Sequence, residues 1–324
     1  MNATDKTWPW KLLLAVILIG VAAGTWGAVQ RIDYQWRWNR VPQYFAYVSE
    51  DAKKIPFDGK VVAIVPEGKD VAVTLAAGKS EKGKSEKVVL SVLADTLKVK
   101  DGDELLAGDT VGFTKSWHFG PLMLGLWTTL WLSAVSSFFG LILGLITGLA
   151  RISKNFTIRW IALLYVECIR GTPLLVQIFI AYFFLGTVFN LSRNVCGVGA
   201  LALFAGAYVA EIVRAGIQSI SKGQTEAARS LGMTAFQTMR DVVMPQAFKR
   251  ILPPLSGQFI SLIKDSSLVS VIAITDLSKS GREIITSTFA TFEVWLIVAA
   301  MYLLVTSLLS QLVFYMERRL AVSD

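Results

Sequence analysis

Apolar runs long enough to cross a membrane recur along this chain and restrict it to the folds that a bilayer allows. They occupy residues 12–29, 120–150, 160–189, 197–217, 255–275 and 294–316. A helix needs about 20 mostly apolar residues to span a hydrocarbon core about 30 Å thick. Since hydrophobic residues make up 53% of the sequence and charged residues only 17%, a polytopic membrane protein is indicated. The pattern predicts an all-α membrane protein with six spans.

The first run follows Lys6 and Lys11 near the N-terminus. A cleavable signal peptide begins in the same way. The run has about 18 residues, enough to span a bilayer, and no Ala-x-Ala cleavage site stands out at its end. We therefore expect residues 1–30 to be a retained transmembrane anchor.

Charge is concentrated between the first two apolar runs. Residues 31–118 hold 14 Lys and Arg and 13 Asp and Glu, against 18 and 11 in the rest of the chain. Alternating apolar residues at 61–65, 71–75, 88–93 and 97–99 predict β-strands. We assign residues 31–116 to a small β-rich insert on the periplasmic side of the membrane.

One segment of this insert, from Gly78 to Ser85, fits the P-loop pattern G-x-x-x-x-G-K-[ST]. A P-loop needs a following helix, whose N-terminus holds phosphate. Residues 88–92 instead predict a strand. We expect a charged hairpin tip here and no nucleotide site.

A polar-flanked segment between two apolar runs has the pattern of a short helix and a sharp stop. Ala227, Ala228 and Leu231 are spaced to share one face, with Glu226 near the positive end of the helix dipole. Gly232 then permits the backbone angles that the stop requires.

A second short helix should follow. Thr234 can cap it, and Pro245 should end it after Phe236, Met239 and Val243. We call residues 226–245 the knob. The knob is too polar for lipid and too apolar for open water. We therefore expect it to bind in a groove on another protein. An ordinary amphipathic re-entrant loop is the alternative.

The knob resembles the signature loop of bacterial ABC-importer permeases: Glu-Ala-Ala, three residues, Gly, nine residues, then apolar-x-apolar-Pro. In that family the loop is a coupling helix that docks into a cytoplasmic ATPase. The resemblance implies that role for Glu226, Ala227, Ala228, Gly232 and Pro245. Three flanking segments resemble the branch that imports polar amino acids: residues 208–217, 222–224 and 264–268.

The likeness covers roughly residues 117–320 and implies a type I importer core of five helices, joined to the N-terminal helix, with a cytoplasmic coupling loop at about 218–252. It implies no cofactor bound by this chain, with Mg-ATP in a partner ATPase. The other implied partners are a second permease subunit, identical or different, a periplasmic amino-acid-binding protein and membrane lipid. Glutamate, aspartate or glutamine is the expected substrate.

Orientation is predicted from the positive charges at the ends of the spans. With both termini inside, the cytoplasmic loops hold thirteen Lys and Arg, whereas the short outer loops hold only Arg193, Lys279 and Arg282. This bias predicts a multi-pass protein of the bacterial inner membrane with both termini and the knob in the cytoplasm. It also accounts for the basic composition without nucleic acid.

Polar residues inside two apolar runs are candidates for the translocation pathway. Lys264, Asp265, Ser266 and Ser267 cannot all face lipid, because each charge there costs at least about 2.5–3.5 kcal/mol. They line either the pathway or a hydrogen-bonded helix contact.

The run at 160–189 is broken at Gly171-Thr172-Pro173. Glu167 and Arg170, three residues apart, can pair beside the break, and Gln177 can face the same cavity. A structural pair that steadies the break is the alternative.

Catalysis by this chain is not expected. His118 is the single histidine, and we place it at a water–lipid boundary. Cys168 and Cys196 form no CxxC motif, so zinc chemistry and a Ser-His-Asp triad are both disfavoured. Two rival functions remain: an ABC permease for another small solute, and a non-transporting scaffold or sensor built around the insert.

Overall fold

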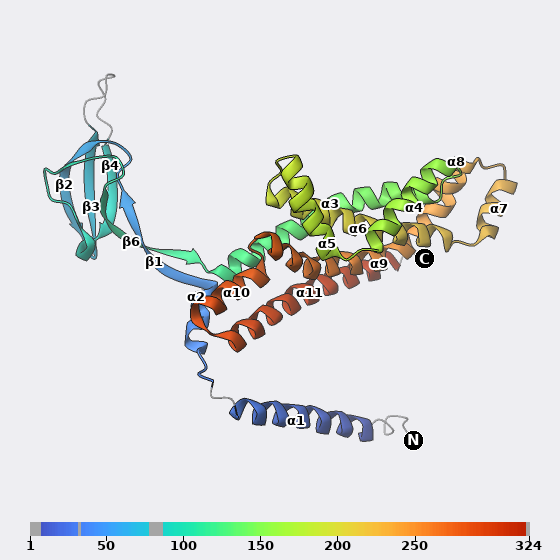
Figure 1. Ribbon diagram of the computed structural model, residues 1–324, viewed down its shortest axis with the longest axis horizontal. Coiled ribbons are helices and arrows are strands. Elements are labelled where there is room, and N and C mark those ends of the chain that lie inside the picture. Colours follow the sequence, from blue (N-terminus) through green and yellow to red (C-terminus); the bar gives the residue numbers. More distant parts are fainter. Residues whose placement is uncertain (1–7, 32–33, 78–86, 322–324) are drawn as a thin grey trace. The chain divides into compact units, whose positions relative to one another are not determined.

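The computed structural model describes residues 8–31, 34–77 and 87–321 (Figure 1). The chain divides into two units, with the boundary between Arg40 and Val41. The first contains helix α1, Trp8–Gln30, and a short 3₁₀ turn η2, Trp38–Arg40. None of the residues in α1 is buried, and its length and hydropathy suit a membrane span, as predicted from residues 12–29.

The second unit contains the β-rich insert. Its strands are β1 (Ala46–Lys54), β2 (Gly59–Glu67), β3 (Asp70–Ala77), β4 (Lys87–Leu93), β5 (Glu104–Leu105) and β6 (Thr110–Phe119). Four of them form an antiparallel sheet in the order β4-β3-β2-β5. Val61, Val73, Leu75 and Val92 are buried in a cluster with Val111 of β6, so the sheet and β6 share one core.

Three of the four strands predicted in the insert are confirmed, and the fourth is wrong. Residues 97–99, which follow the 3₁₀ turn η3 (Ala94–Thr96), form no strand. The Lys98 amide donates to the Val111 carbonyl, but this bond is not continued as a ladder. The P-loop-like segment lies outside the described residues. The residues after it form strand β4, as expected, and not the helix that a P-loop requires.

Strands β1 and β6 form a two-stranded antiparallel ribbon that sequence patterns missed. Its register runs from Ala46↔Phe119 to Lys54↔Thr110. The short helix α2, Val41–Phe45, precedes the ribbon, and one residue, Gly120, separates β6 from helix α3. The Gly120 amide donates to the Phe45 carbonyl at 2.7 Å, and a Cβ at Gly120 would lie 2.2 Å from the Tyr44 carbonyl oxygen. The chain entering β1 and the chain leaving β6 are therefore held together at Gly120.

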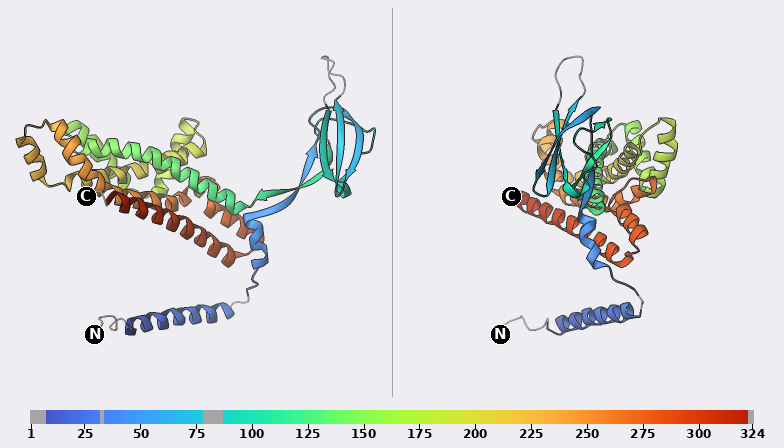
Figure 2. Two further views of the ribbon diagram at one scale, coloured as in Figure 1. Left: turned by 180° about the vertical axis from the view of Figure 1, so that it is seen from behind. Right: turned by 90° about the vertical axis from the view of Figure 1, so that its left-hand side faces the viewer.

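The helical core is built on two long helices, α3 (Pro121–Arg151) and α6 (Arg193–Gln218). They pack through the glycines of α3 at positions 140, 144 and 148: a Cβ at these positions would lie within 2.8 Å of Ala205, Val209 and Val213. Such a stripe of small residues lets a second helix backbone approach closely in lipid. Figure 2 shows α3 and α6 running side by side with α9 and α11.

The predicted break in the third apolar run is also confirmed. Helix α4 (Phe156–Arg170) is followed by α5 (Leu174–Phe179) and a π-helical turn η4 (Ile180–Gly186), and the two halves are bent by 104°. Pro173 stands directly before α5.

The C-terminal part differs from the sequence expectation. Helix α9 runs from Met244 to Asp265 and contains Pro253 and Pro254, so it begins before the apolar run at 255–275 and ends inside it. Each proline removes one backbone donor, yet the helix continues through both. The 3₁₀ helix η6 (Ser266–Ile272), α10 (Leu277–Thr288) and α11 (Thr291–Ala321) complete the chain.

Hydropathy of the described helices supports fewer spans than the six expected. Four helices are long and apolar enough to cross a membrane (α1, α3, α6 and α11), or five if the bent pair of α4 with α5 and η4 counts as one span. The run at 255–275 does not qualify as one helix, because α9 ends inside it at Asp265.

Candidate functional site

The first half of the knob lies in helix α7, Lys222–Ser230, and Gly232 forms the turn that follows the helix. Gly232 has φ +87°, the left-handed conformation that glycine adopts without strain, as predicted. The Met233 amide donates to the Ala228 carbonyl at 3.2 Å, and the Arg229 guanidinium donates to the Met233 carbonyl at 3.0 Å. The first bond satisfies a carbonyl in the last turn of the helix and the second fixes the Met233 carbonyl, so the turn is closed rather than frayed.

The second half of the knob is capped as the sequence suggests. Thr234 accepts from the Gln237 amide, and the Gln237 side chain accepts from the Thr234 amide, which forms a capping box for α8, Ala235–Gln237. A π-helical segment η5, Thr238–Val243, continues it.

Two details of the prediction are wrong. Pro245 does not end a helix: it lies in the first turn of α9, where its missing N–H costs nothing. Glu226 lies in the second turn of α7, because the helix begins at Lys222 and not near Glu226. The carboxylate is exposed and lies farther from the positive end of the helix than expected.

The knob exposes large apolar side chains beside its charged ones. Ala228 is buried, but Ala227 is exposed, and Leu231 and Phe236 have 84% and 71% of their surface exposed. Ala227, Ala228 and Leu231 thus do not form one buried face; two of them point outward with Phe236. Large side chains exposed together at the end of a helix pair are typical of a surface that binds another protein.

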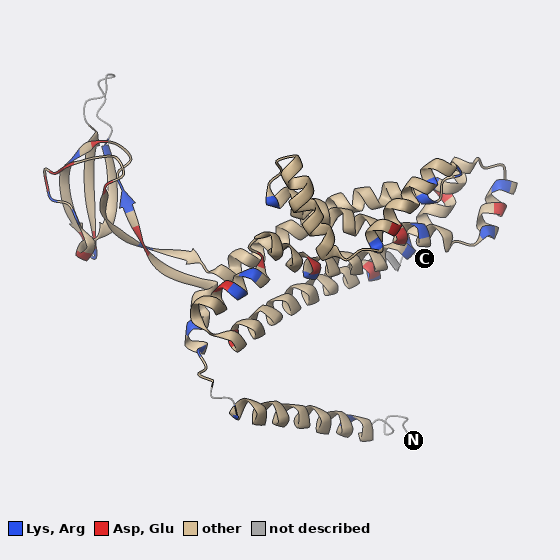
Figure 3. Ribbon diagram, viewed as in Figure 1, with Lys and Arg blue, Asp and Glu red and all other residues tan. Residues whose placement is uncertain are grey.

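Charged residues gather where the long helices end near the knob (Figure 3). Glu211 of α6 lies at the centre. The Arg214 guanidinium donates to both of its carboxylate oxygens, Arg151 Nη1 lies 3.5 Å from Oε2, and Arg170 Nη1 lies 3.8 Å from Oε2. One carboxylate thus joins the ends of α3, α4 and α6.

This cluster changes the partner expected for Arg170. Among the ion pairs of the described residues, Arg170 contacts Glu211 and not Glu167, and it also stacks over the Tyr208 ring at 5.3 Å. Glu167 is exposed. The sequence signal that could have identified the cluster is Glu211 and Arg214, which are three residues apart on a helix.

Gln177 has a structural contact at the bend. Its amide nitrogen donates to the Ile169 carbonyl at 2.7 Å and to the Thr172 hydroxyl at 2.8 Å. It therefore ties α5 to the end of α4 across the break. The structure brings Arg170 to Glu211 and Gln177 to Thr172, but it does not bring Glu167, Arg170 and Gln177 together.

The four polar residues of the other candidate pathway lie where α9 changes into η6. Lys264 is exposed, Asp265 is half-buried, and Ser266 is fully buried with its hydroxyl donating to the Ile263 carbonyl at 2.8 Å. Ser267 is half-buried. Among the described residues, neither the Lys264 side chain nor the Asp265 side chain forms a hydrogen bond or an ion pair with another residue, so both charged groups are available to a ligand or to water.

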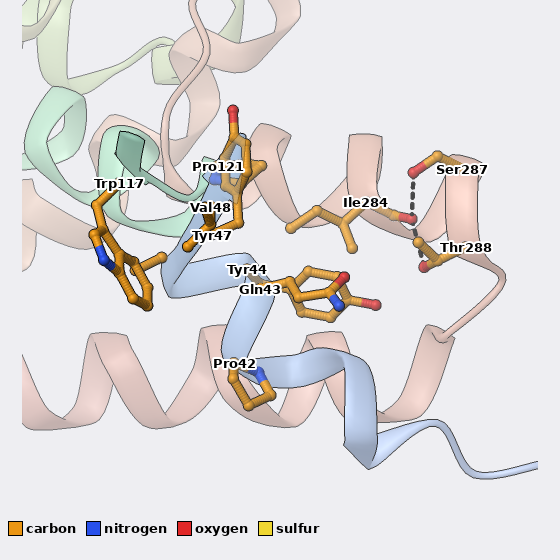
Figure 4. Close-up of a pocket in the computed structure, with 11 residues that line it drawn as sticks. Pro42, Gln43, Tyr44, Tyr47, Val48, Trp117, Pro121, Ile284, Ser287 and Thr288 are labelled. Atoms are coloured by element: carbon orange, nitrogen blue, oxygen red, sulfur yellow. Dashed lines mark hydrogen bonds between the residues drawn. The ribbon is translucent and has the colours of Figure 1, made fainter. Parts of the chain in front are cut away.

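A cavity of about 620 Å³ lies at the base of the ribbon, between α2, β1, α3 and α10 (Figure 4). Aromatic side chains, among them Tyr44, Tyr47 and Trp117, supply much of its wall. The hydroxyls of Ser287 and Thr288 bond to the Ile284 carbonyl of their own helix. This cavity offers mainly apolar surface and no cluster of charged groups.

The site is thus a knob with an exposed apolar tip, joined to charged helix ends. A family model for the inner membrane component of binding-protein-dependent transport systems matches residues 140–322, which include the knob, α6 and α9. The chain belongs to this family.

Relatives of this permease align with more than half of the chain. The glutamine transport system permease protein of Escherichia coli (strain K12) is 40% identical over 210 residues, which are 64% of this chain and 96% of that protein. The L-cystine transport system permease protein of Bacillus subtilis (strain 168) is 45% identical over 206 residues, 62% of this chain and 88% of that protein.

A solved structure is similar as well. The crystal structure of an amino acid ABC transporter with histidines matches with a TM-score of 0.58 and 43% identity, over 61% of this chain and 94% of that chain. The chain is accordingly a permease subunit of an ABC transporter, a multi-pass inner membrane protein and not an enzyme; ATP is hydrolysed by separate ATPase subunits. The β-rich insert lies outside the residues matched by the family model.

Proposed function

We propose that this permease imports polar amino acids across the bacterial inner membrane and that the knob couples it to a cytoplasmic ATPase. The observation that carries the coupling role is the exposed tip of the knob, with Leu231 and Phe236 at 84% and 71% exposure. The Gly232 turn and the Thr234–Gln237 capping box hold this tip in one conformation. A surface ordered before binding loses less conformational entropy when its partner docks.

The coupling residues are Glu226, Ala227, Ala228, Gly232 and Pro245. ATP-driven closure of two ATPase subunits, each holding Mg-ATP, pushes on the knob. The push reaches the transport helices through η5 and α9, which continue directly from it. The carboxylate of Glu211 carries part of the same movement, because it joins α6 to the ends of α3 and α4.

The transport core is a set of five spans: α3, the bent pair of α4 with α5 and η4, α6, α9 with η6, and α11. Helix α1 adds a sixth span, which places both termini and the knob in the cytoplasm and the β-rich insert in the periplasm. One such core does not enclose a pathway alone, so a second permease chain, identical or different, completes it. A periplasmic binding protein delivers the substrate.

Lys264, Asp265, Ser266 and Ser267 are the favoured lining of the pathway. The charged pair is unpartnered among the described residues and lies at a helix end, so a zwitterion can replace water at both groups. Relatives named for glutamine and L-cystine support a polar amino acid as substrate. Glutamine, glutamate or aspartate is the first choice for an uptake screen.

Coupling is tested by Gly232→Val. A β-branched residue at φ +87° is strained by roughly 1–2 kcal/mol and misdirects the tip. We expect normal membrane insertion, reduced copurification of the ATPase and loss of uptake. Gly223→Ala is the matched control, since Gly223 lies in helix α7 and a Cβ there meets only the Ser221 hydroxyl, at 3.5 Å. Full uptake by Gly232→Val would falsify the coupling role.

The pathway is tested by Lys264→Gln and Asp265→Asn in reconstituted transport. Changed substrate affinity or selectivity in either variant, with normal ATPase binding, supports the assignment. Unchanged transport kinetics in both variants would limit these residues to a structural role.

A further inference from the structure

A second cavity of about 580 Å³ lies between the knob and the ends of α3 and α6. Four cationic side chains line it: Arg151, Lys154, Arg159 and Arg229. No Asp or Glu is among its lining residues. A cavity that gathers positive charge from three separate segments has a strongly positive potential and attracts an anion.

Arg151 has a donor that no neighbour satisfies. Its Nη1 is buried and has no hydrogen-bond partner, although it lies 3.5 Å from the Glu211 carboxylate. That carboxylate is already bonded by Arg214 and shared with Arg170. One negative charge thus faces three arginines, so a buried donor and excess positive charge remain for a ligand.

The rest of the wall suits an amphiphile. Ile217, Ile220 and Val243 are buried apolar residues on one side, and Gln218 and Thr225 offer polar groups. A smaller hollow of about 200 Å³ shares Arg151, Arg159 and Gln218 and adds Trp160 and Leu163. An anionic group at the arginines therefore has apolar surface beside it.

Aromatic side chains place this cavity at the level of lipid head groups. Phe156 and Trp160 stand at the start of α4, one turn apart, with ring centres 5.8 Å apart and 64% and 52% of their surfaces exposed. Exposed aromatic residues beside basic ones mark the membrane–water interface. Basic pockets between helix ends at this depth bind phosphate head groups.

We propose that this cavity, formed by Arg151, Lys154, Arg159 and Arg229, binds the phosphate of an anionic membrane phospholipid. The phosphate accepts hydrogen bonds from the arginines, and the glycerol and first acyl carbons lie along the isoleucines and Trp160. The bound lipid joins the α3–α4 connection to the knob. It therefore adjusts how firmly the knob is held and does not replace its ATPase contact.

The test measures lipid binding directly, without transport. The full-length permease is delipidated in detergent and titrated with phosphatidylglycerol, phosphatidylcholine or inorganic phosphate, and bound molecules are counted by native mass spectrometry. We expect saturable binding of phosphatidylglycerol at least about tenfold tighter than that of phosphatidylcholine, because charge-assisted hydrogen bonds distinguish the two.

Lys154→Gln combined with Arg159→Gln should weaken phosphatidylglycerol binding by about tenfold or more. Arg282→Gln is the matched control, since Arg282 is an exposed cation on α10 outside the cavity. Ala235→Trp keeps the charge and fills the cavity from its exposed rim, so it should lower binding as well. If the Ala235→Trp variant elutes as a single folded species, lower binding reflects loss of the site and not loss of the fold.

Equal binding of both lipids, or unchanged binding by the double and the filling variants, overturns the proposal. Tight binding of inorganic phosphate that excludes phosphatidylglycerol overturns the lipid source and assigns the same cations to a soluble phosphate. Because no step of the test requires uptake, its result is independent of the proposed transport function.

Discussion

A single carboxylate, Glu211, carries a large share of the polar contacts inside the helical core. Its two oxygens meet Arg151, Arg170 and Arg214, whose side chains are 12%, 38% and 26% exposed. Partly buried cations that lose their counter-ion repel one another and keep an unsatisfied desolvation cost. Glu211 therefore stabilises three helix ends at once.

We expect Glu211→Gln to lower the free energy of unfolding by about 1–3 kcal/mol, because three partly buried guanidinium groups lose the negative charge of their shared acceptor. Thermal unfolding of the purified protein in detergent measures the change. Glu167→Gln is the matched control: Glu167 is exposed near the end of α4 and contacts no arginine among the described ion pairs. Equal unfolding temperatures for the two variants would contradict this role of Glu211.

At the scale of single elements, the contact between α3 and α6 depends on missing side chains. Gly144 lies against Val209, where an added Cβ would be 2.4 Å from the valine side chain. In lipid, apolar burial does not drive helices together, so close backbone packing has to supply the attraction. The stripe at positions 140, 144 and 148 provides it.

Gly144→Ala should destabilise the fold by about 1–3 kcal/mol, because the helices must separate to admit the methyl group. Gly199→Ala is a suitable comparison, since nothing lies within 4 Å of a Cβ at Gly199 in α6 and alanine favours the helix. Unfolding in detergent distinguishes the two, and a neutral Gly144→Ala would show that the contact is less tight than the distances indicate.

The β1–β6 ribbon contains a pH-sensitive contact. The Ser116 hydroxyl donates to the Asp51 carboxylate, and His118 Nε2 lies 2.7 Å from the same oxygen; together they hold the pKa of Asp51 below its ordinary value. Because the pKa of Asp51 is lower in the folded state, its ionised carboxylate stabilises the ribbon at pH values above the unfolded pKa of about 3.9. This stabilisation is lost as the pH falls through the folded pKa.

Amide exchange in β1 and β6, corrected for the intrinsic rate, should therefore accelerate below a pH of about 4. Asp51→Asn should exchange faster at neutral pH and lack this acid step. Glu50→Gln, on the opposite face of the ribbon, should keep it. Hydrogen exchange followed by mass spectrometry on the full chain measures all three, and an acid step retained in Asp51→Asn would assign it to another group.

The sequence predicted the elements whose cause is local. The Gly232 turn, the Thr234 cap and the break before Pro173 each depend on a residue type at a fixed place. Contacts between distant segments were not predictable in this way. Strands β1 and β6 lie more than fifty residues apart and lack clear alternation, and the arginines around Glu211 come from three helices.

At the scale of the whole molecule, the segment that leads into the insert packs inside the helical core, although the sequence boundaries place it in the insert. Tyr44 of α2 is buried in one cluster with Leu122 of α3, Leu277 of α10 and Val294 of α11. The start of the ribbon therefore belongs to the packing of the helical core, although residues 31–116 were predicted as a separate insert.

Two deletions test whether the base of the ribbon belongs to the helical core or to a separate insert. Removing residues 55–109 and joining Lys54 to Thr110 through an Asn-Gly turn keeps the paired ends of β1 and β6 and should leave a folded, transporting permease. Removing residues 40–114 also removes Tyr44 and should lower stability by about 3–5 kcal/mol, the usual cost of losing a buried aromatic side chain. Membrane yield and unfolding temperature measure both, and equal stability of the two would show that Tyr44 is dispensable.

The pairing of Ala46 with Phe119 determines which polypeptides can replace the insert between β1 and β6. Neighbouring strands lie about 5 Å apart, so the core meets the insert as two chain ends separated by that distance. A polypeptide whose own termini are equally close can replace the present insert without altering the geometry at Gly120. The same junction thus provides an attachment point at which a reporter or a binding module can be placed on the permease, with its transport helices unchanged.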